Sequence, residues 1–176
     1  NKDNWKELLS QEPYNLKFNE YGKFILIRYN QLSSDFSNRL VQESRGCIIN
    51  NETLEYTCRS FIKFFNVQEE LASQIDWESA RIQTKYDGSI IKCWYDGEIW
   101  RVSTNGTIDS STAMIEGDFI SFYELFNMAK GDLDFDKLNK NRSYIFELTS
   151  PLNKVVVDYK EHKIFHIGTI DSETGE

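Results

Sequence analysis

The stretch SIIKCWYDGEIWRVSTNG, residues 89–106, decides the fold class, because it reads as two strands joined by a tight turn. Residues 89–95 and 98–104 are rich in β-branched and aromatic side chains, and Asp96-Gly97 between them is typical of a hairpin turn. Asn105-Gly106 predicts a second turn of the same kind. An antiparallel β-sheet is therefore expected in the middle of the chain.

Further elements are predicted on both sides of this hairpin. Alternating apolar residues favour strands over 21–29, 45–49, 54–59, 81–84, 144–148, 154–157 and 163–170. Apolar residues at helical spacing, or short runs that stop at Pro or Gly, predict helices over 5–9, 67–75 and 119–129. Residues 30–44 read as a polar connection. The pattern indicates one α+β domain over residues 1–176, with antiparallel sheets and flanking helices.

Composition limits the class of protein. A chain of 176 residues with 40% hydrophobic and 14% aromatic side chains can bury a core, which excludes a disordered polymer. No apolar run reaches the length of a membrane span and no signal core is visible, so a soluble, intracellular (cytoplasmic) protein without a membrane partner is expected. The net charge of −8 argues against a broad basic face for nucleic acid, so any RNA contact must be local.

The three cysteines do not indicate a disulfide framework or a zinc site. Cys47, Cys58 and Cys93 form an odd set without CxxC spacing. We expect reduced, buried thiols.

Two local features carry chemical information. Lys85-Tyr86-Asp87-Gly88 places a lysine at the expected end of a strand, before a tight turn. A K-x-D-G string occurs by chance in about one chain in twenty of this length, and an exposed lysine before an Asp-Gly turn is the plain alternative. Glu147 lies inside the apolar strand YIFEL, on the face opposite Phe146 and Leu148. A glutamate there is unfavourable unless it is paired or functional, although an edge-strand charge is the other interpretation.

Five blocks of sequence together resemble a known family. In chain order they are ESRGCIIN (43–50), SFIKFFNVQEE (60–70), TKYDGSIIKCWYDGEIWRVSTNGTIDS (84–110), YIFELTSPLNKVVVDY (144–159) and GTIDSETGE (168–176). They are similar to the phage T4 RNA ligase 1 family of ATP-dependent RNA ligases, in the covalent nucleotidyltransferase superfamily. The resemblance implies a nucleotidyltransferase domain of the ATP-grasp-like ligase adenylation type.

The resemblance implies that Lys85 is the catalytic nucleophile and forms a lysyl-AMP intermediate. A lysine attacks only as the free amine, and at an ordinary pKa near 10.4 about 0.04% of a lysine is deprotonated at neutral pH. Neighbouring cations and a metal disfavour the ammonium form, and the family nominates Arg45 and Lys63, which would also hold the triphosphate. For Arg45 an ion pair with Glu43 is the alternative.

The remaining family positions concern the nucleotide. Phe65 matches the aromatic residue that stacks on adenine, although Phe61, Phe64 and Phe65 together also look like core. Gly88 would let the backbone approach the nucleotide, and Asp87 would orient the turn rather than bind metal. Glu147 would contact the ribose hydroxyls and Mg²⁺, and so is both a nucleotide-binding and a metal-binding candidate. Thr84, directly before the nucleophile, completes the candidate site together with Asn105.

Two departures from the family pattern are visible. Asn105 stands where the family usually carries a lysine or arginine, so phosphate binding there is expected to be weaker. Nothing resembles motif IV, a Glu-Gly-aliphatic strand, or motif V, a Lys-x-Lys strand. We therefore expect the front part of an adenylation domain that is incomplete at its C-terminus and that has little activity alone.

The implied function is ATP-dependent RNA ligation, as used in RNA repair, with ATP and Mg²⁺ as cofactors. The partner would be RNA with 5′-phosphate and 3′-hydroxyl ends, and a phage or virus source fits the family. A DNA ligase or an mRNA-capping nucleotidyltransferase shares the Lys-x-Asp-Gly nucleophile and is one alternative. A noncatalytic nucleotide- or RNA-binding module that retains the fold is another. Which RNA is sealed and whether the protein self-associates stay open.

Overall fold

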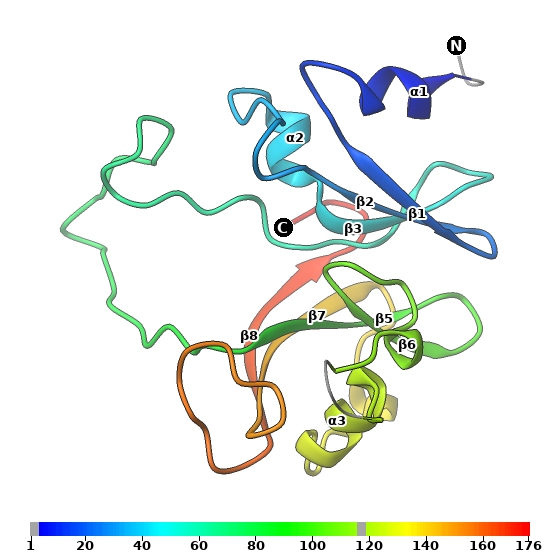
Figure 1. Cartoon of the computed structure of the whole chain (residues 1–176), viewed down its shortest axis with the longest axis vertical. Helices are drawn as coiled ribbons and strands as arrows, with labels where there is room; N and C mark the ends of the chain where they lie inside the picture. The colour runs from blue at the N-terminus through cyan, green and yellow to red at the C-terminus, as the bar shows by residue number, and fades with distance from the viewer. Residues whose placement is uncertain (1–3, 116–118) are drawn as a thin grey trace.

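Two antiparallel four-stranded sheets form the protein. The computed structural model describes residues 4–115 and 119–176. The first sheet has the order β1-β2-β3-β4 and the second has the order β6-β5-β7-β8 (Figure 1). The α+β class with dominant antiparallel sheets is therefore confirmed. The strands are β1 (Lys17–Tyr21), β2 (Phe24–Arg28), β3 (Arg45–Asn50), β4 (Tyr56–Cys58), β5 (Ser89–Tyr95), β6 (Trp100–Thr104), β7 (Arg142–Thr149) and β8 (Lys163–Asp171).

Helices α1 (Trp5–Ser10) and α2 (Arg39–Glu43) cover the outer face of the first sheet. Alternation along β2 and β3 turns one set of apolar side chains to this face, where they pack with Leu16, Val41 and Trp5. Asn38 caps α2 by accepting a hydrogen bond from the Leu40 amide at 2.9 Å. Both helices are short, so packing of Trp5, Leu9 and Val41 on the sheet rather than helix propensity holds them in place.

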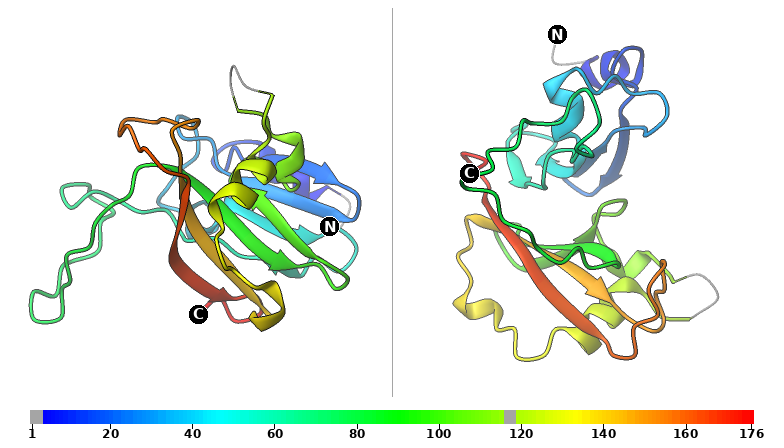
Figure 2. Two further views of the ribbon diagram at one scale, coloured as in Figure 1. Left: turned by 90° about the horizontal axis from the view of Figure 1, so that it is seen from below. Right: turned by 90° about the vertical axis from the view of Figure 1, so that its left-hand side faces the viewer.

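Helix α3 (Phe122–Ala129) covers the outer face of the second sheet, and the layers are visible in the right-hand view of Figure 2. A capping box formed by Ser121 and Glu124 begins this helix. Leu125 and Phe126 are fully buried against the side chains that β5 and β7 turn outward. Two single 3₁₀ turns, η1 (Ser110–Thr112) and η2 (Phe135–Lys137), flank the helix.

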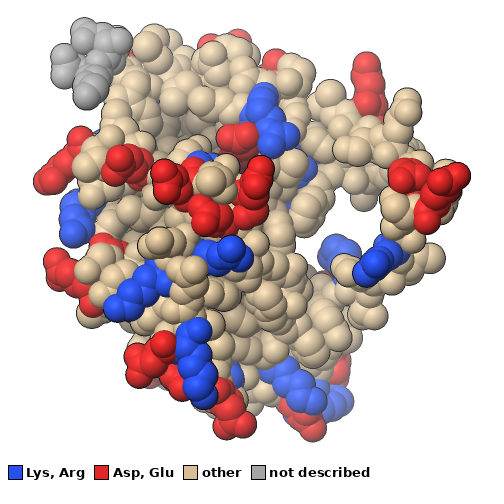
Figure 3. Space-filling view, turned by 180° about the vertical axis from the view of Figure 1, so that it is seen from behind, with Lys and Arg blue, Asp and Glu red and all other residues tan. Residues whose placement is uncertain are grey.

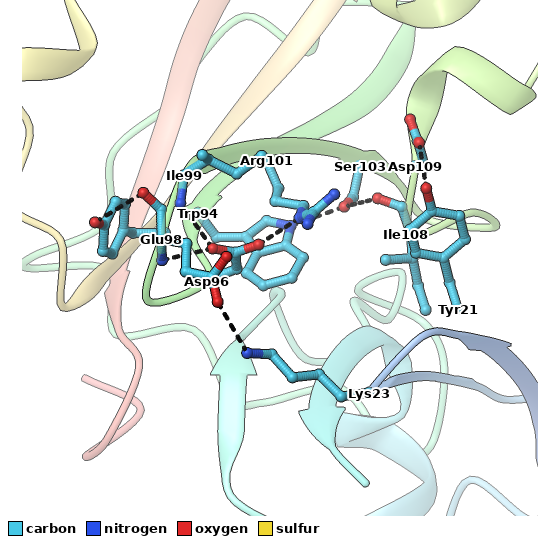
Figure 4. A network of polar contacts seen from close by, with 11 residues as sticks. Tyr21, Lys23, Trp94, Asp96, Glu98, Ile99, Arg101, Ser103, Ile108 and Asp109 are labelled. Carbon is cyan, nitrogen blue, oxygen red and sulfur yellow. Dashed lines mark hydrogen bonds and ion pairs between the residues drawn. The ribbon is translucent and has the colours of Figure 1, made fainter.

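The inner faces of the two sheets meet in a third core. Phe24 of β2 and Trp94 of β5 contact edge to face, with ring centroids 5.1 Å apart. Beside this pair, polar contacts join the sheets: Lys23 lies 3.9 Å from Glu98, and the Tyr21 hydroxyl donates to Asp109 at 3.1 Å (Figure 4). Asp96 binds Arg101 at 2.6 Å within the second sheet. This arrangement leaves the inner faces as the only sheet surfaces that the described helices do not cover.

The structure bears out most of the predicted strands and corrects several boundaries. The strand expected over 21–29 is wrong at its start, because Gly22 has a positive φ of 56° and turns the chain between β1 and β2. The polar connection over 30–44 contains α2. The helix expected at 119–129 begins later, at Phe122, and the turn at Asn105-Gly106 closes through Thr104 and Thr107 without a strand after it.

Three predicted elements are absent from the described chain. Residues 67–75 form no helix, and residues 81–84 and 154–157 form no strands. Val67, Leu71 and Ile75 have the helical spacing but are exposed, so no packing surface offsets the entropy cost of helix formation. As a result, Lys85 does not end a strand: it lies in the irregular segment 59–88, which extends away from the sheets in Figures 1 and 2.

Candidate functional site

Glu147 occupies the inner face of the second sheet, where it faces the first sheet. It pairs with Ile90 of β5, while its neighbours Phe146 and Leu148 point into the outer core, as the alternation predicts. Its Oε1 accepts a hydrogen bond from the Gly88 amide at 2.9 Å. Burial raises the pKa of Glu147, and the Gly88 hydrogen bond with the nearby positive charges of Lys85 and Arg45 partly opposes that rise. Three of the predicted site residues, Gly88, Lys85 and Arg45, thus influence the pKa of the Glu147 carboxylate.

Gly88 is required by its close packing rather than by its dihedral angles. A Cβ atom built on Gly88 would overlap the carbonyl oxygen of Leu148 in β7. Only glycine lets the chain cross β7 this closely and still present its amide to Glu147. Lys85, three residues earlier, is exposed, and its ammonium group forms no hydrogen bond or ion pair with the part of the chain that the structure describes. The nucleophile candidate is therefore accessible.

Asp87 connects the segment Lys85–Gly88 to the loop between β7 and β8 through hydrogen bonds. Its Oδ2 accepts hydrogen bonds from the amides of Val156 at 2.6 Å and Val157 at 2.7 Å. These bonds hold the pKa of Asp87 below its usual value. Tyr86 stacks on Phe165 of β8 with ring centroids 3.6 Å apart. The expected role of Asp87 as an orienting residue agrees with this geometry. The amides of Val156 and Val157 bind Asp87 instead of a neighbouring strand.

Arg45 is the first residue of β3, and its side chain contacts the segment that leads into Lys63-Phe64-Phe65-Asn66. Its Nη1 donates to the carbonyl of Ile62 at 3.3 Å, and its guanidinium carbon lies 4.7 Å from the ring centroid of Phe64. The alternative ion pair with Glu43 is not formed, because the Glu43 carboxylate binds Arg39 at 2.6 Å. Arg45 is therefore free of carboxylate partners among the described residues.

Lys63 and Phe65 lie on the side of α2. The Lys63 ammonium is 5.0 Å from the ring centroids of both Phe36 and Phe65, and its amide donates to the carbonyl of Gln42 at 2.9 Å. Lys63 and Phe65 line a cavity of about 380 Å³ together with Ile62, Phe64 and Leu71. No described contact joins Lys63 or Phe65 to Lys85 or Glu147. The structure thus brings Gly88 into contact with Glu147, three residues after Lys85. Arg45 contacts Ile62 and Phe64, which line the cavity of Lys63 and Phe65, and its charge also acts on the Glu147 carboxylate.

Thr84 and Asn105 occupy the remaining predicted positions. Thr84 is exposed beside Lys85. The backbone of Asn105 packs against Gly46, next to Arg45, and the Asn105 Oδ1 is buried without a hydrogen-bond partner among the described residues. Asn105 therefore adjoins Gly46, the residue after Arg45, but it brings no charge to that position.

Two aromatic residues near Arg45, Phe61 and Phe64, had core as their only interpretation from the sequence. Phe64 is 60% exposed, and the Arg45 guanidinium lies over its ring. Phe61 packs so tightly on Gly168 of β8 that a Cβ atom there would overlap its ring, and its centroid is 5.3 Å from that of Phe64. The run of three aromatics signals a shared cluster, but sequence spacing alone cannot say which ring faces solvent.

The donor set allows one mode of metal binding. No group of three His, Cys, Asp or Glu side chains suited to a metal ion occurs in residues 4–115 and 119–176. Mg²⁺ commonly binds through one or two carboxylates together with substrate phosphates and water. The single carboxylate of Glu147, with one oxygen committed to Gly88, fits that mode rather than a cage made by the protein alone.

The three cysteines are free and buried, as expected. Burial raises the pKa of Cys47 to about 12, so its thiol is unreactive at neutral pH. Among the described residues, no helix is long and apolar enough to cross a membrane. Acidic and basic side chains are interspersed over the face shown in Figure 3, without a broad basic surface there.

Comparisons with known proteins identify the family. The RNA ligase family model of the T4 RNA ligase 1 type matches residues 43–175. A protein of Autographa californica nuclear polyhedrosis virus, named for bifunctional polynucleotide kinase/RNA ligase activity, is 28% identical over 94% of this chain and 27% of its own length. The RNA ligase of Rhodothermus phage RM378 is 26% identical over 88% of this chain and 43% of its own length. The chain thus spans less than half of either relative, and it belongs to the T4 RNA ligase 1-like family of RNA ligases.

Proposed function

We propose that this chain performs the adenylation chemistry of an ATP-dependent RNA ligase, with Lys85 as the nucleophile. The proposal is supported by the family match and by one observation above all: the exposed lysine is followed by a glycine whose amide is held by Glu147. This contact connects the segment that carries Lys85 to the inner face of the second sheet. The charge of Arg45, a residue of the first sheet, also acts on the Glu147 carboxylate.

In the first step the Lys85 amine attacks the α-phosphate of ATP. A phosphorus–nitrogen bond forms, the bond to pyrophosphate breaks, and the amine loses its proton. Arg45 would hold the triphosphate and the leaving pyrophosphate, and Lys63 would assist from the neighbouring cavity. Phe65 would stack on adenine, with Phe64 as the second candidate because its ring is the more exposed.

Glu147 has two tasks in this scheme. Through Gly88 it holds the backbone after the nucleophile, and its remaining oxygen would bind the ribose hydroxyls or Mg²⁺. Mg²⁺ would neutralise the charge that develops on the phosphates. Thr84 and Asn105 would contact the nucleotide without adding charge.

The later steps concern RNA. AMP would pass from Lys85 to an RNA 5′-phosphate, and a 3′-hydroxyl would then displace AMP to form the phosphodiester bond. These steps rest on the family, because the chain covers less than half of its relatives. The family match favours RNA over DNA sealing or mRNA capping.

Intact-mass analysis tests the first step. The chain and its Lys85→Ala variant are incubated with ATP and Mg²⁺, and the full encoded protein is treated in parallel. We expect a mass gain of one AMP in the unmodified protein and none in the variant, with the adduct mapped to Lys85. A gain that persists in Lys85→Ala would contradict the assigned nucleophile.

The second candidate function is a noncatalytic nucleotide- or RNA-binding module, favoured by the uncharged Asn105. If neither the chain nor the full protein gains AMP, yet either binds ATP or RNA, this second function replaces the first.

A further inference from the structure

Lys92 is a fully buried lysine that the proposed chemistry does not use. It lies at the centre of β5, paired with Ser103 on one side and Ile145 on the other, and its side chain has no solvent exposure. Trp94, two residues later on the same face, packs against the first sheet. Lys92 therefore projects between the two sheets, toward β3.

The partner of the Lys92 ammonium is a main-chain carbonyl. Its Nζ donates a short hydrogen bond to the carbonyl oxygen of Gly46. Besides burial, which lowers the pKa of Lys92, the groups that act on that pKa are the thiols of Cys58 and Cys47. No carboxylate among the described residues binds this ammonium. A buried lysine with neutral partners is costly, so a stability role alone does not account for it.

Gly46 is the extra residue of a β-bulge. Ile27 pairs with Cys47 and Arg28 pairs with Arg45, so Gly46 has no partner residue on β2. Its φ of +82° is favourable only for glycine, and a Cβ atom there would lie 2.8 Å from the Asn105 carbonyl oxygen and 3.0 Å from the Lys92 Nζ. Bulges bend a strand and redirect the side chains beside them. Here the side chain beside the bulge is that of Arg45.

We propose that Lys92 is a positioning residue for Arg45: its ammonium group, by binding the Gly46 carbonyl, holds the bulge that directs the Arg45 guanidinium toward the nucleotide phosphates. The inference rests on the proposed function. In this proposal Lys92 of β5, the strand that follows Lys85 in the second sheet, controls the position of Arg45, a phosphate-binding residue of the first sheet. It also explains why a charged group is kept at a place where an apolar side chain would pack at lower cost.

The test is the ATP dependence of Lys85 adenylylation in the full encoded protein. Lys92→Met removes the ammonium and keeps the length of the side chain. We expect the half-saturating ATP concentration to rise at least tenfold, with a smaller change in the maximal rate. Loss of folded protein would lower the fraction that reacts but would leave the half-saturating concentration of the folded fraction unchanged. Ile91→Val, a buried change on the outer face of the same strand, is the control and should behave as the unmodified protein.

A double-mutant cycle with Arg45→Ala tests whether Lys92 acts through Arg45. We expect the double variant to be no more impaired than the worse single variant; effects that multiply would overturn the proposal. If Lys92→Met fails to fold, Lys92→Gln takes its place in the cycle, and an unchanged half-saturating ATP concentration in either variant overturns the role of the ammonium. Absence of an AMP adduct in the unmodified protein would instead overturn the proposed function, so the two failures are distinguishable.

Discussion

Glu147 combines a buried position with a functional contact. It lies on the inner face of β7, and its carboxylate holds the Gly88 amide at 2.9 Å. Burial is the largest influence on its pKa and raises it above the usual 4.5. The folded protein therefore binds a proton at Glu147 more tightly than the unfolded chain does. The contribution of Glu147 to the free energy of unfolding is therefore fully present below pH 4.5, and it is lost as the pH rises through the raised pKa.

We predict that Glu147→Gln increases the free energy of unfolding at neutral pH relative to the unmodified protein. The glutamine oxygen can still accept from Gly88, while the cost of burying a charge disappears. The difference between the two proteins should grow from about pH 4 to pH 7. Urea denaturation over this range measures it, with the exposed Glu173→Gln as a control that shows no such trend. The variant should nevertheless form less of the AMP adduct.

Gly88→Ala tests the close packing beside Glu147. The added Cβ would overlap the Leu148 carbonyl, which cannot move without shifting β7. We expect a loss of about 1–3 kcal/mol in the free energy of unfolding, together with loss of adenylylation. The matched control is Gly106→Ala, where the nearest side-chain atom is 3.8 Å away. Equal stability of the two variants would contradict the packing argument.

At the scale of elements, the loop between β7 and β8 depends on Asp87. Two amides of this loop, Val156 and Val157, donate to one carboxylate oxygen. These bonds, that of Val157 first, lower the pKa of Asp87 from 3.8. The stabilisation is therefore present above pH 3.8 and is lost as the pH falls through the lowered pKa.

We predict that Asp87→Ala accelerates hydrogen exchange at the amides of Val156 and Val157 by at least about tenfold at neutral pH. Exchange measured by NMR or mass spectrometry reports this directly. Asp158→Ala serves as the control, because Asp158 lies in the same loop and its carboxylate binds the exposed Lys160 rather than a loop amide. Unchanged exchange in Asp87→Ala would show that other contacts hold the loop.

For the whole molecule, the contact between the sheets decides whether the site exists. Arg45 belongs to the first sheet and Glu147 to the second, and the two sheets join through Phe24, Trp94 and the polar network of Figure 4.

Burial raises the pKa of Asp96, but the hydrogen bonds of Ile99, Glu98 and Arg101 outweigh the effect of burial and lower that pKa overall. Asp96 is therefore charged at neutral pH.

We predict that Trp94→Ala lowers the free energy of unfolding by about 3–5 kcal/mol, because it leaves a cavity between the sheets. Adenylylation should be lost with it, since Arg45 and Glu147 belong to two different sheets whose packing depends on Trp94. Urea denaturation and intact-mass analysis measure the two effects. Trp77→Ala removes an indole that is 79% exposed and should change neither.

Individual residues show which parts of the structure could be predicted from the sequence. The strand over Ser89–Tyr95 and the position of Glu147 opposite its apolar neighbours were predictable, because alternation in a strand assigns each side chain to a face. Helix α2 was missed, although Asn38 is a recognisable cap, because its sequence is polar. The helix expected at 67–75 and the strand expected at 154–157 were wrong, because spacing says nothing about whether a packing surface or a pairing strand is present.

The sequence by itself determined the fold class, the family and the candidate residues, since local pattern and motif order are written along the chain. Only the tertiary structure decided that Glu147 holds the Gly88 amide, that Arg45 lies on Phe64, and that Lys92 binds Gly46. Each of these contacts joins segments far apart in sequence. Their geometry depends on how two sheets pack and where one strand bulges, and neither is encoded in local spacing.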